Sequence, residues 1–292
     1  MFRRRKFEIE THGLYPRDKV IVHDSAEHMM MTPKLRDLIE EEWQKKEARM
    51  VKREGLFFSG DLCRLNRYEV RENELHLFLG RTHFKELLGT NLSHPIIHKL
   101  LGEEYMSNGL GVRAAICTHD EKIIICQRSE KVMEAAGYYH LCGGYVKPSK
   151  HHRRGIPDPY LSMESYMEEE LGISKESIRR LVCSGLAVNS ETLKPELMFE
   201  AEIDLTFRKV LVNMAKAARD FTHSELFGIM AQKTSLRGFL VANKRKIAPT
   251  GQACLWIYGI EKGYWPEVRK GILKRYAERK LRRKADENRG RS

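Results

Sequence analysis

The feature that constrains the fold most is a pair of glycines that is followed by a polar loop and then by an acidic helix. The pair is Gly143 and Gly144, which is expected to break the chain, and the loop at 148–160 contains three prolines and two histidines. Residues 161–171 have the pattern of a helix, which Gly172 is expected to end. Carboxylates three and four positions apart share one face of a helix, so this segment can hold hard divalent cations through oxygen.

Segments typical of strands flank this helix on both sides. The expected strands are 62–79 with a turn at 71–74, the hairpin 110–126, and 182–188, 197–203, 226–231 and 253–260. The expected helices are 33–50, 83–88 with an end at Gly89, 161–171, and a basic helix at the C-terminal end. Strands arranged around one acidic helix predict an α/β fold, with a mixed sheet sandwiched between helices.

Composition narrows the class of protein. Hydrophobic residues make up 41% of the 292 residues, which is enough for a sizeable core and excludes global disorder. No apolar run approaches the ~20 residues that a membrane helix needs, so we expect no membrane partner. The basic N-terminus runs into Glu8 and Glu10 instead of an apolar stretch, so we expect no secretory signal. The six cysteines form no CxxC pair, which favours reduced thiols and a cytoplasmic location.

The positive charge lies at the two ends of the chain. Residues 262–292 and 3–6 together account for the formal net charge of +12, so the remaining body is neutral. Basic ends of this kind suggest a nucleic acid or another polyanion as a partner. A solvated tail that binds nothing is the alternative reading.

The segment from Gly143 to Ile173 resembles the Nudix box, G-x5-E-x7-R-E-U-x-E-E-x-G-U, where U is an aliphatic residue. Aligned from the C-terminal end, Glu169 and Glu170 match the paired glutamates and Gly172 the box glycine. The departures are Ser165 and Tyr166 at the Arg-Glu positions, Lys150 in place of the early glutamate, and a longer loop. An alternative register would pair Glu164 with Glu168, but it places Glu170 at the glycine position and matches less well.

Segments on both sides of the box resemble one branch of the Nudix family, the UDP-glucose/UDP-galactose diphosphatases. The resemblance runs unevenly from about residue 55 to 260, and its segments are 79–91, 109–115, 127–137, 185–192 and 222–228. It implies a Nudix-type α/β/α sandwich, dependence on Mg²⁺ or Mn²⁺, and cleavage of a UDP-sugar into UMP and a sugar 1-phosphate. It also implies an N-terminal α+β accessory region at 1–107, a Nudix domain at 108–262 and a basic C-terminal helix or tail at 263–292.

The resemblance assigns roles to individual residues. Glu169 and Glu170 are the expected metal ligands and catalytic carboxylates, and Glu225 is a candidate general base from a late loop. Arg128 would grip a phosphate, or else form a surface ion pair with Glu130 or Glu134. The other residues expected to bind substrate are Gly144, Tyr145, Lys147, Asn91, Asn189 and Glu191. Buried loop caps are the alternative for the asparagines, and His151 and His152 are interpreted as loop histidines.

Three function classes remain open. The first is an active magnesium-dependent nucleotide-sugar diphosphatase, and the second is a Nudix-like nucleotide-binding protein that has lost catalysis. Tyr166 favours the second class, because a phenol is a poor ligand for Mg²⁺; we expect it to weaken metal binding unless it packs on the sheet. The third class is a ribonucleoprotein component docked through the basic termini. The sugar, the base and the oligomeric state stay open.

Overall fold

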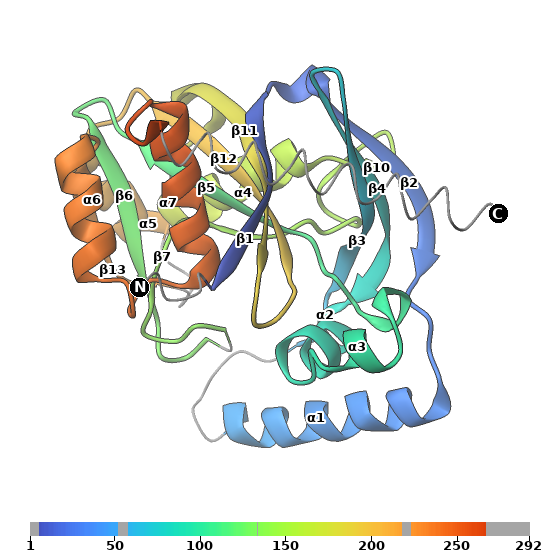
Figure 1. Cartoon of the computed structure of the whole chain (residues 1–292). Coiled ribbons are helices and arrows are strands. Elements are labelled where there is room, and N and C mark those ends of the chain that lie inside the picture. Colours follow the sequence, from blue (N-terminus) through green and yellow to red (C-terminus); the bar gives the residue numbers. More distant parts are fainter. Residues whose placement is uncertain (1–5, 52–57, 133, 218–222, 267–292) are drawn as a thin grey trace.

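A strand near the N-terminus and strands between residues 111 and 230 form one large mixed sheet (Figure 1). The computed structural model describes residues 6–51, 58–132, 134–217 and 223–266. The strand order is β1-β11-β12-β5-β6-β13, with β7 beside β6 and β8 beside β5. Their bounds are β1 Phe7–Tyr15, β5 Gly111–Cys117, β6 Lys122–Arg128, β7 Tyr139–His140, β8 Gly143–Tyr145, β11 Ile178–Asn189, β12 Pro195–Ile203 and β13 His223–Met230. Among the described strand pairs of this sheet, β12 and β5 run parallel and the others antiparallel, which makes the sheet mixed.

Helices cover both faces of this sheet and bury its side chains. The helices α4 (Pro159–Leu171) and α5 (Phe207–Ala217) share one core cluster with the sheet, through residues such as Met167 and Val210. The helices α6 (Lys233–Ala242) and α7 (Pro249–Glu261) share the other, through residues such as Leu236 and Ile257 (Figure 1). The predicted α/β/α sandwich with a mixed sheet is therefore confirmed.

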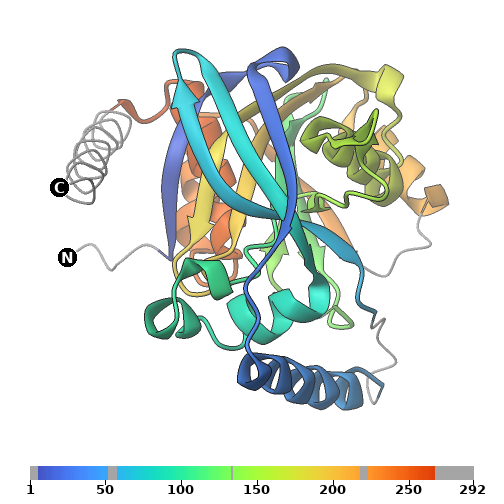
Figure 2. The same ribbon diagram turned by 90° about the vertical axis from the view of Figure 1, so that its right-hand side faces the viewer.

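A second sheet of three strands packs on the core that contains α4 (Figure 2). Its order is β2-β4-β3, with β2 at Val20–His28, β3 at Asp61–Arg71 and β4 at Glu74–His83. The predicted alternation in β4 is confirmed, because Leu75, Leu77 and Leu79 have no exposed surface. Since these side chains join the same cluster as those of α4, the extra sheet is fixed beside the acidic helix.

The N-terminal region also holds a small helical layer. The helix α1 (Pro33–Val51) confirms the prediction for 33–50, and the hydroxyl of Thr32 accepts a hydrogen bond from the Leu35 amide at 3.2 Å. The remaining elements are α2 Phe84–Leu87, a π turn at Leu88–Leu92, α3 Ile97–Leu100, 3₁₀ turns at Arg17–Lys19, Glu103–Tyr105 and Lys175–Ser177, and the small hairpin β9 His152–Arg153 and β10 Ile156–Pro157.

Two expectations about glycines need correction. Gly89 does not end its helix, because the chain continues as the π turn. A Cβ at Gly89 would lie 2.6 Å from Ile39 Cγ1, so this glycine allows the turn to approach α1 closely. The pair Gly143 and Gly144 does not break the chain either, since it forms β8 against β5.

The strand predicted at 253–260 is wrong, because these residues lie in α7. The run is apolar on all sides, and nearly all of it is buried. A continuous apolar run cannot be assigned to a helix or a strand from periodicity alone. Pro249 at the first turn is the signal that would have favoured the helix.

Several elements lie outside the predictions. The pattern missed β1, β2, α5 and α6. Because β1 is an edge strand of the large sheet, residues before 108 contribute to that sheet, and the division at 108 stays a proposal. The basic helix expected at 263–292 lies almost entirely outside the described residues. In the part of the chain that is described, no helix is long and apolar enough to cross a membrane.

Candidate functional site

The acidic helix α4 has well-defined ends. Asp158 caps its N-terminus by accepting hydrogen bonds from the Tyr160 amide at 2.8 Å and the Leu161 amide at 3.1 Å. The helix thus begins two residues before the predicted 161. Gly172 ends it in the left-handed conformation with a φ of 64°, as predicted. These caps fix which residues occupy the last turn.

The side chain of Tyr166 packs against β8. Its side chain is 8% exposed, and its hydroxyl donates to the Tyr145 carbonyl at 2.9 Å and accepts from the Tyr145 amide at 3.0 Å. The ring covers Gly144, where a Cβ would lie 2.4 Å from Tyr166 Cζ. Burial raises the pKa of Tyr166, so the phenol is neutral. Tyr166 therefore packs on the sheet, as the alternative expects, and it lies close enough to Glu169 and Glu170 for their charges to act on its pKa.

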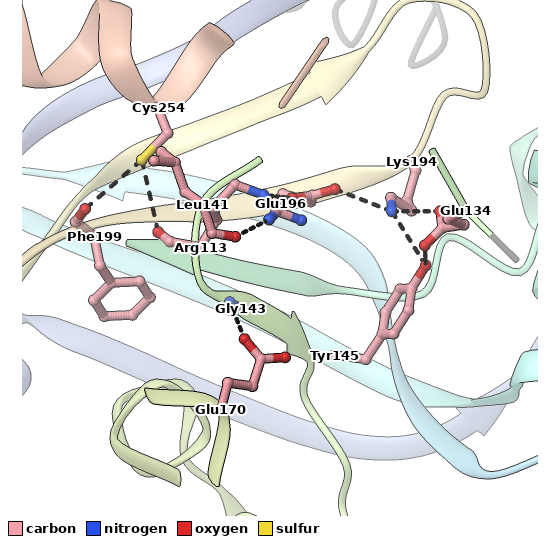
Figure 3. Close-up of polar contacts among 10 residues, drawn as sticks. All are labelled: Arg113, Glu134, Leu141, Gly143, Tyr145, Glu170, Lys194, Glu196, Phe199 and Cys254. Carbon is pink, nitrogen blue, oxygen red and sulfur yellow. Dashed lines mark hydrogen bonds and ion pairs between the residues drawn. The ribbon is translucent and has the colours of Figure 1, made fainter. Parts of the chain in front are cut away.

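Glu169 and Glu170 occupy the last turn of α4. Glu169 accepts a hydrogen bond from Ser165 at 2.9 Å and forms an ion pair with Lys150 at 2.6 Å. Burial raises the pKa of Glu169, but the hydrogen bonds from Lys150 and Ser165 outweigh burial, so the pKa lies below its usual value. Glu170 accepts a hydrogen bond from the Gly143 amide at 3.4 Å, which brings the helix to the start of β8 (Figure 3).

Glu164, the acidic residue of the alternative register, is engaged elsewhere. It forms an ion pair with Arg17, which also contacts Asp158 at 3.2 Å. This pair joins the start of α4 to the short turn before β2. The site therefore gains no carboxylate from Glu164.

The candidate donor set for a metal consists of two adjacent carboxylates, Glu169 and Glu170. Within the described residues, no group of three or more His, Cys, Asp or Glu side chains could hold a metal ion. Mg²⁺ is commonly held by one or two carboxylates together with waters and substrate phosphates. Glu169 and Glu170 thus fit a cation that binds together with a phosphate-containing substrate, and they do not form a complete metal site by themselves.

Arg128 at the end of β6 faces the same side of the sheet as Glu170. Strand alternation places it with Cys126, which lies in the core cluster of α4, and the charges of both Arg128 and Glu170 act on the pKa of that thiol. The Nε of Arg128 is buried, and no hydrogen-bond partner for it exists among the described residues. No ion pair with Glu130 or Glu134 forms there. A buried donor without a partner is costly, which makes this guanidinium a candidate ligand for an anion.

A buried chain of charges runs behind β8 (Figure 3). Arg113 of β5 binds Glu196 of β12 at 2.7 Å, and Lys194 contacts Glu196 at 3.0 Å. Lys194 also binds Glu134 at 2.7 Å and the hydroxyl of Tyr145 at 3.1 Å. Tyr145 donates to Glu134 at 2.6 Å, so the tyrosine belongs to this network.

The charges of this buried network of Arg113, Glu196, Lys194 and Glu134 compensate one another. Burial lowers the pKa of Lys194, but the carboxylates Glu134 and Glu196 outweigh burial and raise it. Two cations thus face two carboxylates, and the loop with Glu134 is tied to β8. From the sequence, Tyr145 was expected to bind substrate and Glu134 to pair with Arg128, whereas Arg113, Lys194 and Glu196 had no expected role. The charged residue Arg113, inside the otherwise apolar strand β5, was the signal that could have found this network.

Lys147 and His151 line the loop between β8 and α4. The ammonium of Lys147 lies 5.9 Å from the centre of the Tyr166 ring. The Lys147 amide donates to His151 Nδ1 at 3.2 Å, and the imidazole is almost fully buried against Tyr166. Burial lowers the pKa of His151 to about 4, so the ring is neutral near pH 7. The histidine packs the loop, in keeping with its interpretation as a loop histidine.

The structure does not bring three other predicted residues to this site. Asn91 is fully buried and bonds to Asn108 at 3.1 Å and to the Thr192 carbonyl at 3.0 Å. Asn189 accepts from the amides of Glu191 and Thr192, so both asparagines act as loop caps. Glu191 is exposed and pairs with Lys6 at 2.9 Å.

Glu225 lies on the other face of the large sheet. It pairs with Gln127 across β13 and β6, and alternation places it with Phe227, which packs against the core cluster of α6 and α7. The glutamates of α4 lie on the opposite face. The position therefore separates this candidate base from Glu169 and Glu170.

Comparisons with known proteins give partial matches. No family model matches the chain. It is 34% identical over 94 residues to the mouse (Mus musculus) protein named uridine diphosphate glucose pyrophosphatase NUDT22, covering 30% of each chain. It is 30% identical over 132 residues to Nudix hydrolase 9 of Arabidopsis thaliana, covering 40% of this chain and 41% of that one. The chain thus spans well under half the length of the curated relatives it matches.

Solved structures match with lower sequence identity. One is a MutT protein from Methanosarcina mazei, at 18% identity and a TM-score of 0.35, covering 52% of this chain and 94% of that one. The sequence matches relate these segments of the chain to the Nudix hydrolase superfamily.

Proposed function

We propose that the chain hydrolyses the diphosphate bond of a nucleoside diphosphate-sugar, of the UDP-glucose or UDP-galactose type, to UMP and a sugar 1-phosphate. The observation that carries the proposal is the buried Nε of Arg128, a donor without a partner among the described residues, on the same side of the sheet as Glu170. A substrate phosphate would satisfy this donor. The partial similarity to uridine diphosphate glucose pyrophosphatases supports the choice of substrate.

The acidic and the basic residues of the site would have different roles. Glu169 and Glu170 would hold Mg²⁺ or Mn²⁺, which when bound neutralises the diphosphate and activates water. Arg128 would orient a phosphate through its fork of N–H donors. Lys147 and Lys150 flank the same end of α4 and add positive charge there. Tyr166 and Gly144 keep β8 against the helix, so the Gly143 amide stays beside Glu170.

A second candidate is a nucleotide-binding protein without turnover. The ion pair between Lys150 and Glu169 favours it, because the ammonium already compensates one of the two carboxylates. The absence of a third ligand group among the described residues favours it as well. Both candidates place a nucleotide at the same surface, and they differ in whether the diphosphate bond breaks.

Turnover of UDP-glucose distinguishes the two candidates. The full chain is incubated with UDP-glucose and Mg²⁺, and release of UMP and glucose 1-phosphate is measured for the wild type, Glu169→Gln, Glu170→Gln and Glu168→Gln. Glu168 is the matched control, since it is an exposed neighbour on the same helix. We expect Glu170→Gln to lose most magnesium-dependent activity and Glu168→Gln to keep it. Binding of UDP-glucose without release of UMP by the wild type would select the second candidate.

The ribonucleoprotein role rests on residues outside the described ones. Deletion of 267–292 tests it, because the retained Trp265 packs in the core cluster of α7 and the cut spares it. We expect the deletion to weaken binding to polyanions, to reduce its salt dependence, and to leave turnover unchanged. An unchanged salt dependence would show that the basic segment is a solvated tail that does not bind polyanions.

A further inference from the structure

A cavity of about 330 Å³ lies between the three-stranded sheet and the loop that leads into α4. His28 at the end of β2 and Thr82 and His83 at the end of β4 form one side, and Pro148 and Ser149 form the other. Asp61 and Arg81 complete the lining. The volume lies in the range of roughly 300–1,000 Å³ that small-molecule sites occupy. None of the roles assigned above uses this cavity.

The loop is fastened to the sheet at this cavity. The amide and the hydroxyl of Ser149 both donate to the carboxylate of Asp61, each at 2.9 Å. Burial raises the pKa of Asp61, but these hydrogen bonds outweigh burial and lower it, so the carboxylate is ionised at neutral pH. Asp61 therefore provides acceptor oxygens, each already accepting one hydrogen bond from Ser149, at the wall of this open cavity.

The other charged residue of the lining is neutralised in place. Arg81 binds Asp24 with both ends of its guanidinium, one of them at 2.6 Å. Two imidazoles lie in the lining: the rings of His28 and His83 are 6.3 Å apart at 18°, and the side chain of His83 is 49% exposed. Nδ1 of His83 lies 3.7 Å from Glu86, at the start of α2, so its Nε2 is the atom offered to a ligand. The ionised carboxylate of Asp61 would repel an anionic ligand. A metal ion is not favoured either, because the described residues contain no group of three side chains that could hold one. The lining suits a neutral ligand that both donates and accepts hydrogen bonds, such as a sugar.

The cavity lies next to the acidic end of α4 along the chain. Ser149 precedes Lys150, and Lys150 contacts Glu169 at 2.6 Å. Neighbouring Cα atoms are about 3.8 Å apart, so the wall of the cavity and the charged end of the site belong to one short stretch of loop. A ligand with phosphates at the charged end can extend its other end into the cavity.

We propose that this cavity binds the sugar of the nucleoside diphosphate-sugar, with His28, His83 and Asp61 contacting its hydroxyls. This inference rests on the proposed function. It predicts that the accessory sheet determines which sugar the protein accepts, while the box end of α4 binds the diphosphate. The two imidazoles would supply one hydrogen bond each.

Binding of UDP-glucose is compared with binding of UDP by calorimetric titration, with UMP release monitored in the same samples. The variants are His28→Ala, His83→Ala and the double variant, and the control is His98→Ala, an exposed histidine of α3. Loss of two hydrogen bonds should weaken UDP-glucose about tenfold and leave UDP within about twofold. The control should change neither ligand, and circular dichroism checks the fold of each variant.

Three results would overturn the assignment of the cavity. In the first, the double variant weakens both ligands equally, and in the second it weakens neither. In the third, the wild type binds UDP-glucose no more tightly than UDP. Failure of the wild type to bind either ligand would instead contradict the proposed function as well.

Discussion

The phenol of Tyr166 and the backbone of Tyr145 are joined by two hydrogen bonds, at 2.9 and 3.0 Å. The side chain donates to the carbonyl and accepts from the amide, as a neighbouring strand would. In this chain the residue at a box carboxylate position thus serves as a structural link between α4 and β8.

Removal of the Tyr166 hydroxyl should destabilise the protein. Tyr166→Phe leaves the Tyr145 amide and carbonyl without these partners in a buried place, which costs about 1–3 kcal/mol of unfolding free energy. Tyr166→Glu should cost more, because it buries a carboxylate, and it should not improve Mg²⁺ binding. Urea unfolding and metal titration measure the two effects. Tighter Mg²⁺ binding by a folded Tyr166→Glu variant would contradict this and show that position 166 faces the metal.

Gly144 should tolerate no side chain. A Cβ there would lie 2.4 Å from the Tyr166 ring, so Gly144→Ala must displace the ring or β8 and should cost about 1–3 kcal/mol. Gly238→Ala is the matched control, since that glycine lies in α6 with open space around it. The control should be neutral or stabilise by about 0.5–1 kcal/mol, because alanine favours helices. Equal unfolding midpoints for the two variants would contradict the packing described.

The sequence predicted the parts of the fold that have a clear period or cap. Leu75, Leu77 and Leu79 alternate, and their strand formed; Thr32 and Gly172 mark helix ends, and both ends are where they were expected. The run at 253–260 has no period, so its helix was mistaken for a strand. The alternation of apolar and polar residues identifies a helix or strand when one of its faces is exposed. It is absent from a segment that is buried on all sides.

The site was less accessible to the sequence than the fold. The paired glutamates were found because the box spacing is local, but the direction of Tyr166 depends on the glycine beneath it. The partners of Arg113 lie 28 and 83 positions away in the chain, at Leu141 and Glu196. The separation of Glu225 from α4 follows from the register of β13 against β6, which no local pattern marks.

Lys150 should compete with a divalent cation for Glu169. Lys150→Glu removes the ammonium at 2.6 Å and restores the carboxylate that the box has at this position. We expect Mn²⁺ to bind about tenfold more tightly without substrate, a difference of about 1.4 kcal/mol. Lys45→Glu on α1 is the control, with the same change of charge at an exposed place. Titration followed by electron paramagnetic resonance measures free Mn²⁺. If both variants bind Mn²⁺ equally, the competition does not exist.

The buried carboxylate Glu196 should make stability depend on pH in acid. Burial raises its pKa, but the charges of Arg113 and Lys194 outweigh burial and lower the pKa from 4.5 to about 2. Because the folded pKa is the lower one, the contribution of Glu196 is present above about pH 4.5 and is lost as the pH falls to about 2. Glu196→Gln should reduce this acid slope of the unfolding free energy.

The same variant should be less stable at neutral pH. It leaves Arg113 and Lys194 buried without the carboxylate, a change that typically costs about 3–5 kcal/mol. Urea unfolding between pH 2 and 7 measures both the slope and the loss. An acid slope equal to that of the wild type would show that other carboxylates dominate acid unfolding.

The most direct measurement of the central claim is a crystal structure with UDP-glucose and Mn²⁺ bound. The anomalous signal of Mn²⁺ locates the cation independently of the protein density. The account predicts the cation at the carboxylates of Glu169 and Glu170, and a phosphate oxygen within hydrogen-bond distance of Arg128 Nε. A cation remote from both glutamates, or a diphosphate that leaves Arg128 without a contact, would contradict it.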